Sequence, residues 1–171
     1  MTAETLTATR GATGFPVAAF AGAGVVQVAY GSYTIAAAVE TGDIFEMCWV
    51  PAGAVILGGM VYAADIDTGT EALDMDLGWA ANGGSGTYDA VDTDGLGNFG
   101  TWTGDAFANP SISPVTGNMI PLSGAFLAGG VLPYFTKKTK IQLYANTASN
   151  AGHTGAVSVV VFYTVDPTLV A

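Results

Sequence analysis

The sequence predicts an all-β protein, an antiparallel β-sandwich of the jelly-roll type with about eight strands. Short apolar or alternating segments recur along the chain, separated by turns rich in Gly, Asn and Asp, and almost none has helical spacing. The chain has 171 residues, the size of one domain. A long central segment without strand pattern interrupts simple up-and-down succession, which favours a jelly roll over a lipocalin-like barrel.

The domain organisation predicted from the pattern has two parts. Residues 1–23 are rich in Thr, Ala and Gly and have neither helical nor strand periodicity, which is typical of an extended arm that anchors a subunit to its neighbours. Residues 24–171 then form a single sandwich domain. Glu4 stands where a secretion signal would carry its basic residues, so we expect no such signal.

The first strand region covers residues 24–39, as one strand or as a pair bent at Gly31 and Ser32. The sequence carries no charge between Arg10 and Glu40, a window long enough to cross a bilayer. Its glycines, its polar residues and its period-two alternation instead favour a loop followed by a buried strand.

A turn at 40–43 precedes a strand at 44–50, which ends at the turn Pro-Ala-Gly, 51–53. The next strand, 54–63, is apolar on both faces. We expect it to lie centrally, covered on one side by the core and on the other by a second layer or subunit. Gly58 and Gly59 inside it indicate a bulge or a close backbone approach.

An acidic turn follows at 65–69, where short carboxylates can accept hydrogen bonds from nearby backbone amides. We expect the chain to return there as a hairpin, with a strand at 71–79. In that strand Leu73, Met75 and Leu77 alternate with Asp74 and Asp76, so the aspartates should lie on a solvated face.

Residues 80–118 form a long excursion rich in Gly, Asn, Asp, Thr and Ser, with a short helix expected near 104–109. Its aromatic residues should pin it to the domain. They are Tyr88, Phe99, Trp102 and Phe107. Long excursions in compact domains often make functional contacts.

Strands resume at 118–122, 131–135, 140–146 and 155–165. The last is apolar on both faces and belongs in the middle of a sheet or at a subunit contact. Lys137, Lys138 and Lys140 are interpreted as charges that solubilise a strand edge, and the alternative is contact with an acidic partner.

Composition limits the classes of function. Half of the residues are hydrophobic and only 11% are charged, which leaves an apolar surface and predicts oligomerisation. The formal net charge of −10 repels phosphate backbones and anionic lipid, so we expect neither nucleic acid nor membrane as a partner.

No pattern supports an enzyme. Asp74 and Asp76 have the separation of an inverting glycosidase pair, about 7 Å, but nothing nearby in the sequence would raise the pKa of either. Cys48 lies in an apolar run and is interpreted as a buried, inert thiol. His153 lies in a turn and is expected to be exposed, without the partners that a zinc site or a serine triad needs.

Two loop motifs have alternative explanations. Asp89, Asp92 and Asp94 could bind calcium, but they lack EF-hand spacing and an acidic surface loop is favoured. Residues 95–100 match the glycine pattern of dinucleotide-binding proteins, but they follow aspartates instead of a strand and are interpreted as a flexible loop. We therefore expect no catalytic, cofactor-binding or metal site and no cofactor.

Three segments resemble virion structural proteins of tailed bacteriophages, among them capsid decoration or cement proteins. They are Gly-Asp-Ile-Phe-Glu-Met at 42–47, Val-Pro-Ala-Gly-Ala at 50–54 and Leu-Asp-Met-Asp-Leu-Gly-Trp at 73–79. The resemblance implies a homotrimeric jelly-roll protein, made in the bacterial cytoplasm, on the outer capsid surface of the virion. There it would clamp neighbouring major capsid protein subunits and perform no reaction.

Two other functions remain open at this point. A glycan-binding jelly roll would use Trp79, Trp102, Tyr88 and the acidic loop as a sugar platform, whereas the simpler interpretation makes these aromatics core and loop anchors. A head fibre or tail component of the virion would have the same sequence character as a capsid clamp.

Overall fold

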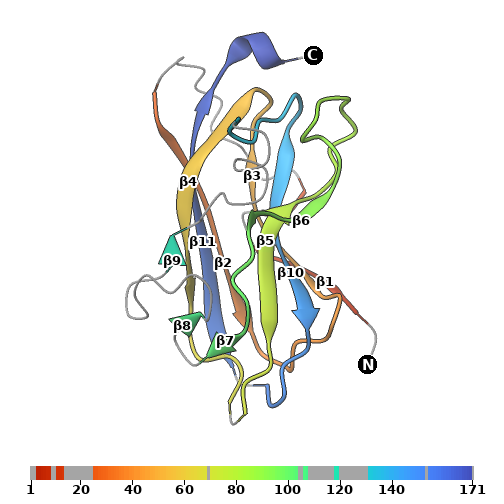
Figure 1. Ribbon diagram of the computed structural model, residues 1–171, viewed down its shortest axis with the longest axis vertical. Helices are drawn as coiled ribbons and strands as arrows, with labels where there is room; N and C mark the ends of the chain where they lie inside the picture. Colours follow the sequence, from red (N-terminus) through yellow and green to blue (C-terminus); the bar gives the residue numbers. More distant parts are fainter. Residues whose placement is uncertain are drawn as a thin grey trace.

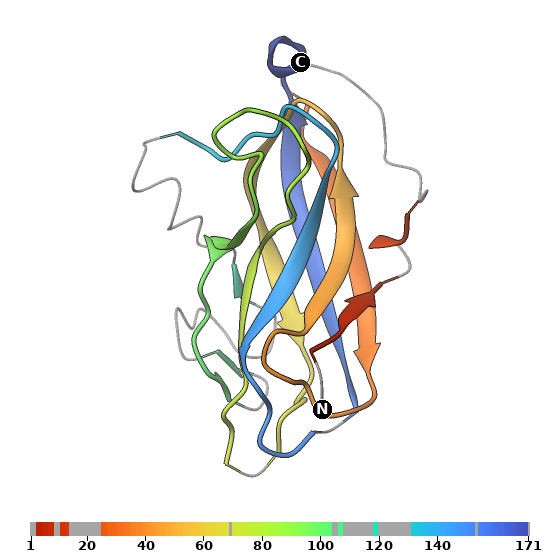
Figure 2. The same ribbon diagram turned by 90° about the vertical axis from the view of Figure 1, so that its right-hand side faces the viewer.

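Two facing sheets form the protein in the computed structural model, which describes residues 3–8, 11–13, 25–68, 70–103, 106–107, 118–119, 131–152 and 154–170. Figure 1 shows the sheet of β4, β11 and β2 on the left and that of β5 and β10 on the right, and Figure 2 views the molecule from the β10 side. The strands are β1 (Thr5–Thr7), β2 (Gln27–Ile35), β3 (Ile44–Val50), β4 (Ala54–Ala63), β5 (Asp74–Trp79), β6 (Asp92–Gly97), β7 (Trp102–Thr103), β8 (Ala106–Phe107), β9 (Asn118–Met119), β10 (Thr139–Thr147) and β11 (Gly155–Val165). A short 3-10 helix, η2 (Pro167–Leu169), follows β11.

The strand order confirms the predicted jelly roll. One sheet has the order β1-β3-β10-β5-β6 and the other β2-β11-β4-β9, with β7 and β8 as a separate pair. The antiparallel pairs are nested, because β2 pairs with β11, β3 with β10, β4 with β9 and β5 with β6. A long hairpin folded over itself produces this nesting.

The hydrophobic core lies between the two sheets. Its largest buried side chains are Trp79, Trp102, Tyr163, Phe45, Phe99, Phe135, Met47, Ile56, Ile66, Leu73, Met75 and Leu77. Strand β2 passes close to β3 at Gly31, where an added Cβ would overlap the Met47 carbonyl. The expected bend at Gly31 is therefore wrong: β2 is one strand, and the glycine allows the two backbones to approach.

The strands predicted at 44–50, 54–63 and 155–165 are confirmed. Strand β11 lies between β2 and β4, in the middle of its sheet, as its two apolar faces predicted. The bulge predicted at Gly58 is also present. Phe162 pairs with Gly58 and Tyr163 with Ile56, which leaves Leu57 without a partner in the register.

The hairpin expected between β4 and β5 is wrong, because β4 belongs to one sheet and β5 to the other. The chain crosses between the sheets at Asp67, whose Oδ2 accepts hydrogen bonds from the amides of Ala72 (2.7 Å) and Leu73 (2.9 Å) and whose Oδ1 accepts one from Ala151. The predicted contact of a turn carboxylate with backbone amides is thus confirmed. It stabilises a connection between the two sheets, however, and not a hairpin turn.

The long excursion contains more regular structure than predicted. Strand β6 includes residues 95–97, so the flexible-loop interpretation is wrong for them, and an added Cβ at Gly95 would overlap the Trp79 ring. Ala106 and Phe107 form β8 and not the expected helix, whose other residues lie outside the described part of the chain.

Residues 131–135 form no continuous strand but bond to the beginning of β4. The Gly53 amide donates to the Phe135 carbonyl, and the Ile56 amide donates to that of Pro133.

Of the charge-free window before Glu40, residues 27–35 form β2 and residues 14–24 lie outside the described part. Among the residues that the structure describes, no helix is long and apolar enough to cross a membrane.

Candidate functional site

The two sheets differ in charge. Strands β2, β4, β9 and β11 contain no Asp, Glu, Lys or Arg. The charged strand residues of the other sheet are Glu46, Asp74, Asp76, Asp92, Asp94 and Lys140. In a chain with net charge −10, a sheet without charges is a surface where another protein can pack without bringing like charges into contact.

The outward side of this sheet is mostly apolar and partly exposed, with Ser32 and Ser158 among its polar members, and we call it the uncharged face. Adjacent rows place Val28 beside Phe162 and Gly58, and Tyr30 beside Val160 and Met60. Val28 is 49% exposed, Tyr30 48%, Leu57 38% and Tyr62 36%. These side chains are candidates for burial against another subunit, as the two-sided apolar pattern of β4 and β11 indicated.

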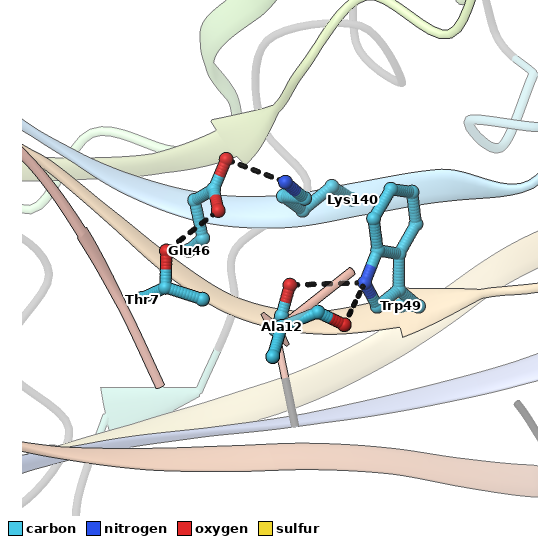
Figure 3. A network of polar contacts seen from close by, with 6 residues as sticks. Thr7, Ala12, Glu46, Trp49 and Lys140 are labelled. Atoms are coloured by element: carbon cyan, nitrogen blue, oxygen red, sulfur yellow. Dashed lines mark hydrogen bonds and ion pairs between the residues drawn. The ribbon is translucent and has the colours of Figure 1, made fainter. Parts of the chain in front are cut away.

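An N-terminal clasp lies on the other sheet (Figure 3). Strand β1 pairs in parallel with β3, with Thr7 opposite Glu46. Glu46 accepts a hydrogen bond from the Thr7 hydroxyl at 2.7 Å through one oxygen, and its other oxygen lies 2.5 Å from Lys140 Nζ. One carboxylate therefore joins β1, β3 and β10.

Trp49 forms the second half of the clasp. Its indole N–H donates to the carbonyls of Gly11 (3.0 Å) and Ala12 (3.3 Å), as Figure 3 shows for Ala12. The ammonium groups of Lys138 and Lys140 lie 4.4 and 4.7 Å from the centre of its ring, within the range of a cation–π interaction.

The clasp corrects the interpretation of the lysine cluster. Strand β10 (Thr139–Thr147) lies between β3 and β5, so Lys140 does not lie on a strand edge. Lys138 and Lys140 belong to the clasp, while Lys137 donates to the Gly83 carbonyl at 3.1 Å. Only the pairing of β10 with β3 reveals this role.

The Asp74 and Asp76 pair also differs from expectation. Asp76 is only 2% exposed, so the prediction that it lies on a solvated face is wrong. Its carboxylate accepts hydrogen bonds from the Asn146 side chain, the Phe99 amide (3.3 Å) and the Asn98 side chain (3.4 Å). The segment after β6 covers β5 at this position.

Burial raises the pKa of Asp76 to about 6, and it also raises the pKa of Asp74, whose buried Oδ1 has no hydrogen-bond partner among the described residues. The expectation that nothing would raise these pKa values is therefore wrong. A raised pKa suits a general acid, but in this conformation the Asp76 carboxylate is enclosed by donors of its own chain.

Asp89 is a buried loop anchor, so the acidic-surface interpretation is wrong for it. It accepts hydrogen bonds from the Asn82 side chain (2.6 Å), the Gly86 amide (2.7 Å), and the amide (3.1 Å) and hydroxyl (2.5 Å) of Thr136. Burial alone would raise the pKa of Asp89, but bonds from Thr136, Asn82 and Gly86 hold it below its usual value.

The structure does not bring Asp89, Asp92 and Asp94 together as ligands of a calcium ion. In the described ranges, no three His, Cys, Asp or Glu residues are placed to hold a metal ion, and Asp92 instead accepts a hydrogen bond from the Asp94 amide. Cys48 is buried, as predicted, and His153 lies outside the described residues.

The aromatic residues are core and loop anchors, and the sugar platform is wrong. Trp79 is buried, donates to the Ala90 carbonyl at 2.8 Å and packs edge-on against Tyr88 and Phe135. Trp102 is buried and donates to the Met75 carbonyl at 3.0 Å. Neither ring is available to stack on a sugar.

These features define a jelly-roll domain whose distinctive surfaces suit packing against other proteins.

No family model and no curated protein matches the sequence. Two solved structures share the fold. A chain titled "Cyanophage Pam1 capsid asymmetric unit" is similar at TM-score 0.56 and 20% identity, over 91% of this chain and 96% of that chain. A chain titled "Capsid of Ralstonia phage GP4" is similar at TM-score 0.55 and 16% identity, over 95% of this chain and 98% of that chain. At these identities the likeness concerns the fold.

Proposed function

We propose that the protein is a structural, non-enzymatic component of a bacteriophage virion, a decoration or cement protein on the outer face of the head. The observation that carries the proposal is the likeness to two chains from phage capsid structures, which covers 91% and 95% of this chain. It also covers 96% and 98% of the two neighbours, so the shared unit is the whole jelly roll.

The uncharged face supports a role in assembly. Copies of a chain with net charge −10 repel each other least where their contact brings no carboxylates together, and the sheet of β2, β11 and β4 has none. Exposed Val28, Leu57 and Tyr62 would be buried in such a contact. A homotrimer that packs through this face is part of the proposal.

The division into an arm, residues 1–23, and a sandwich domain, residues 24–171, is also part of the proposal. The described portion of the arm includes β1, which pairs with β3 of its own chain. An arm that reached a neighbouring capsid subunit would do so with residues beyond the clasp, or after the clasp opened.

The proposed mechanism is stabilisation by binding. A protein that binds the assembled shell more tightly than the free capsid subunits shifts the equilibrium toward the shell. The apolar area buried at each contact supplies the free energy, and no bond is made or broken.

Co-sedimentation with phage heads tests this function. The purified protein is mixed with expanded, empty heads that lack it, and bound protein is measured after the particles are pelleted. We expect saturable binding and a higher temperature of head disruption. A folded protein that pellets with no head would contradict the proposal.

A head fibre or tail component is the second candidate, because it shares the resemblance to virion proteins. Electron microscopy of particles that carry the protein separates the two. Density spread over the head surface supports decoration, and density confined to a vertex or to the tail supports the second candidate.

A further inference from the structure

A pocket lies where strand β1 meets the end of β2, the beginning of β3 and the loop 36–43 that connects them. Its volume is about 190 Å³. Leu6, Tyr33, Ile35 and Phe45 supply apolar lining, and Ile35 and Phe45 are almost completely buried. An engineered apolar cavity of about 150 Å³ holds a benzene molecule, so this pocket has room for the alkyl part of a side chain.

The pocket lining also contains acidic residues with different roles. Asp43 holds the backbone, because its carboxylate accepts the amide of Glu4 at 2.6 Å and that of Glu40 at 2.8 Å. The carboxylates of Glu4 and Glu40 form no hydrogen bond or ion pair with any residue in the described part of the chain. Two uncompensated negative charges therefore border an apolar pocket.

We propose that this pocket binds the side chain of a lysine or arginine from a partner protein. Such a side chain combines an alkyl stem, which fits the apolar lining, with a terminal cation, which fits Glu4 and Glu40. The net charge of −10 adds a field that attracts a cation to the pocket.

We assign the pocket to a different protein, because this chain offers few cations of its own. The sequence has four basic residues, and three of them are engaged within the protein: Lys140 by Glu46, Lys138 by the Trp49 ring and Lys137 by the Gly83 carbonyl. The fourth, Arg10, lies outside the described residues. This proposal does not rest on the proposed function.

The clasp shown in Figure 3 maintains the pocket. Glu4 and Leu6 line the pocket from β1 and the residue before it, and β1 is held on β3 by Thr7, Glu46 and Lys140. Loss of the clasp should release one wall, so clasp variants should also lose binding in the pocket.

An NMR titration with n-butylguanidinium chloride tests the proposal on the isolated protein. This probe carries the cation and alkyl stem of an arginine side chain. We expect saturable shift changes at Leu6, Ile35 and the amides of Glu4 and Glu40, with smaller changes for butan-1-ol, which lacks the charge. Equal changes with butan-1-ol, or changes that do not saturate, would overturn it.

Variants give the second arm of the test. Glu4→Gln combined with Glu40→Gln should weaken probe binding about fivefold. The matched control, Asp65→Asn with Asp94→Asn, removes the same charge from exposed positions outside the pocket and should change binding less than about twofold. Ala37→Leu, which enlarges a side chain of the pocket lining, should also weaken binding.

Binding by the glutamine pair as tight as that of the unmodified protein would refute the role of the two glutamates. The titration contains no phage particle, so its outcome is independent of co-sedimentation with heads. A protein that binds the probe but no head would contradict the proposed function alone.

Discussion

Lys140 Nζ lies 2.5 Å from Glu46 Oε1, and the second oxygen of the same carboxylate accepts the Thr7 hydroxyl. Glu46 is 39 residues from Thr7 and 94 from Lys140 in the sequence. The side chains of Lys140 and Glu46 are only 13% and 19% exposed, so this pair is better shielded from solvent than a surface ion pair.

Lys140→Met should loosen the clasp, because it keeps the alkyl stem and leaves Glu46 without its cation. We expect a loss of about 1 kcal/mol in the free energy of unfolding and faster amide exchange at Ala8, whose N–H donates to the Glu46 carbonyl. Urea unfolding and hydrogen exchange measure the two effects. Lys137→Met is the control, and equal exchange at Ala8 in both variants would contradict the clasp.

Gly31→Ala should destabilise the sandwich by about 3 kcal/mol, because the new Cβ would overlap the Met47 carbonyl and push β2 away from β3. Chemical denaturation measures the change. Thr34→Ala, on an exposed position of the same strand, should change stability by less than about 0.5 kcal/mol. Similar stabilities for the two variants would show that the strands do not approach so closely.

Asp89→Asn should destabilise the protein by about 2 kcal/mol near neutral pH, because an amide cannot accept all the hydrogen bonds that the carboxylate accepts from Asn82, Gly86 and Thr136. The native pKa of Asp89 lies below its ordinary value. Its stabilising contribution is therefore present above the unfolded pKa and is lost as the pH falls through the native pKa. Thermal unfolding at several pH values checks this, and a penalty that grows toward acid pH would contradict it.

Asp76 should produce the opposite pH dependence. Its native pKa is about 6, against 3.8 as the ordinary value, so the unfolded state loses this proton first as the pH rises. The free energy of unfolding should therefore fall between these two pH values. After allowance for screening by polar neighbours, we expect a fall of about 1 kcal/mol that Asp76→Asn does not show.

The comparison uses denaturation of both proteins across the same pH range, with an NMR titration of the Asp76 carboxyl. Asp74 and Asp94 are the charged neighbours that further raise its pKa, and both are retained in the variant. Parallel stability curves for the two proteins would exclude the predicted effect.

Val28→Lys should weaken self-association, because the contact would have to bury an unpaired ammonium in the uncharged face. Sedimentation velocity should show a shift toward monomer. Val91→Lys is the matched control, since Val91 is 58% exposed, compared with 49% for Val28, and lies outside this face. Equal association of both variants, or a monomeric unmodified protein at every concentration, would argue against this interface.

Local sequence patterns predicted the longer strands well because their side chains alternate or are uniformly apolar between recognisable turns. The bounds of β3, β4 and β11 and the bulge at Gly58 follow from such patterns. The placement of β4 and β5 in different sheets did not follow from the sequence, because the same acidic turn can close a hairpin or connect two sheets. The pocket at Glu4 and Glu40 left no local signal, since residues at the start of the chain, Glu4 and Leu6, meet the end of β2, the loop 36–43 and Phe45 of β3 there.

The sequence by itself determined an all-β jelly roll, a chain poor in charge, and apolar strands that require cover on both faces. Only the tertiary structure decided that Asp76 is buried, that Lys140 belongs to a clasp, and that Trp79 and Trp102 lie in the core. The physical reason is the nested pairing, which brings residues such as Ile35 and Gly155 together from distant parts of the chain. Burial and partners depend on these long-range contacts, whereas strand formation depends on neighbours in sequence.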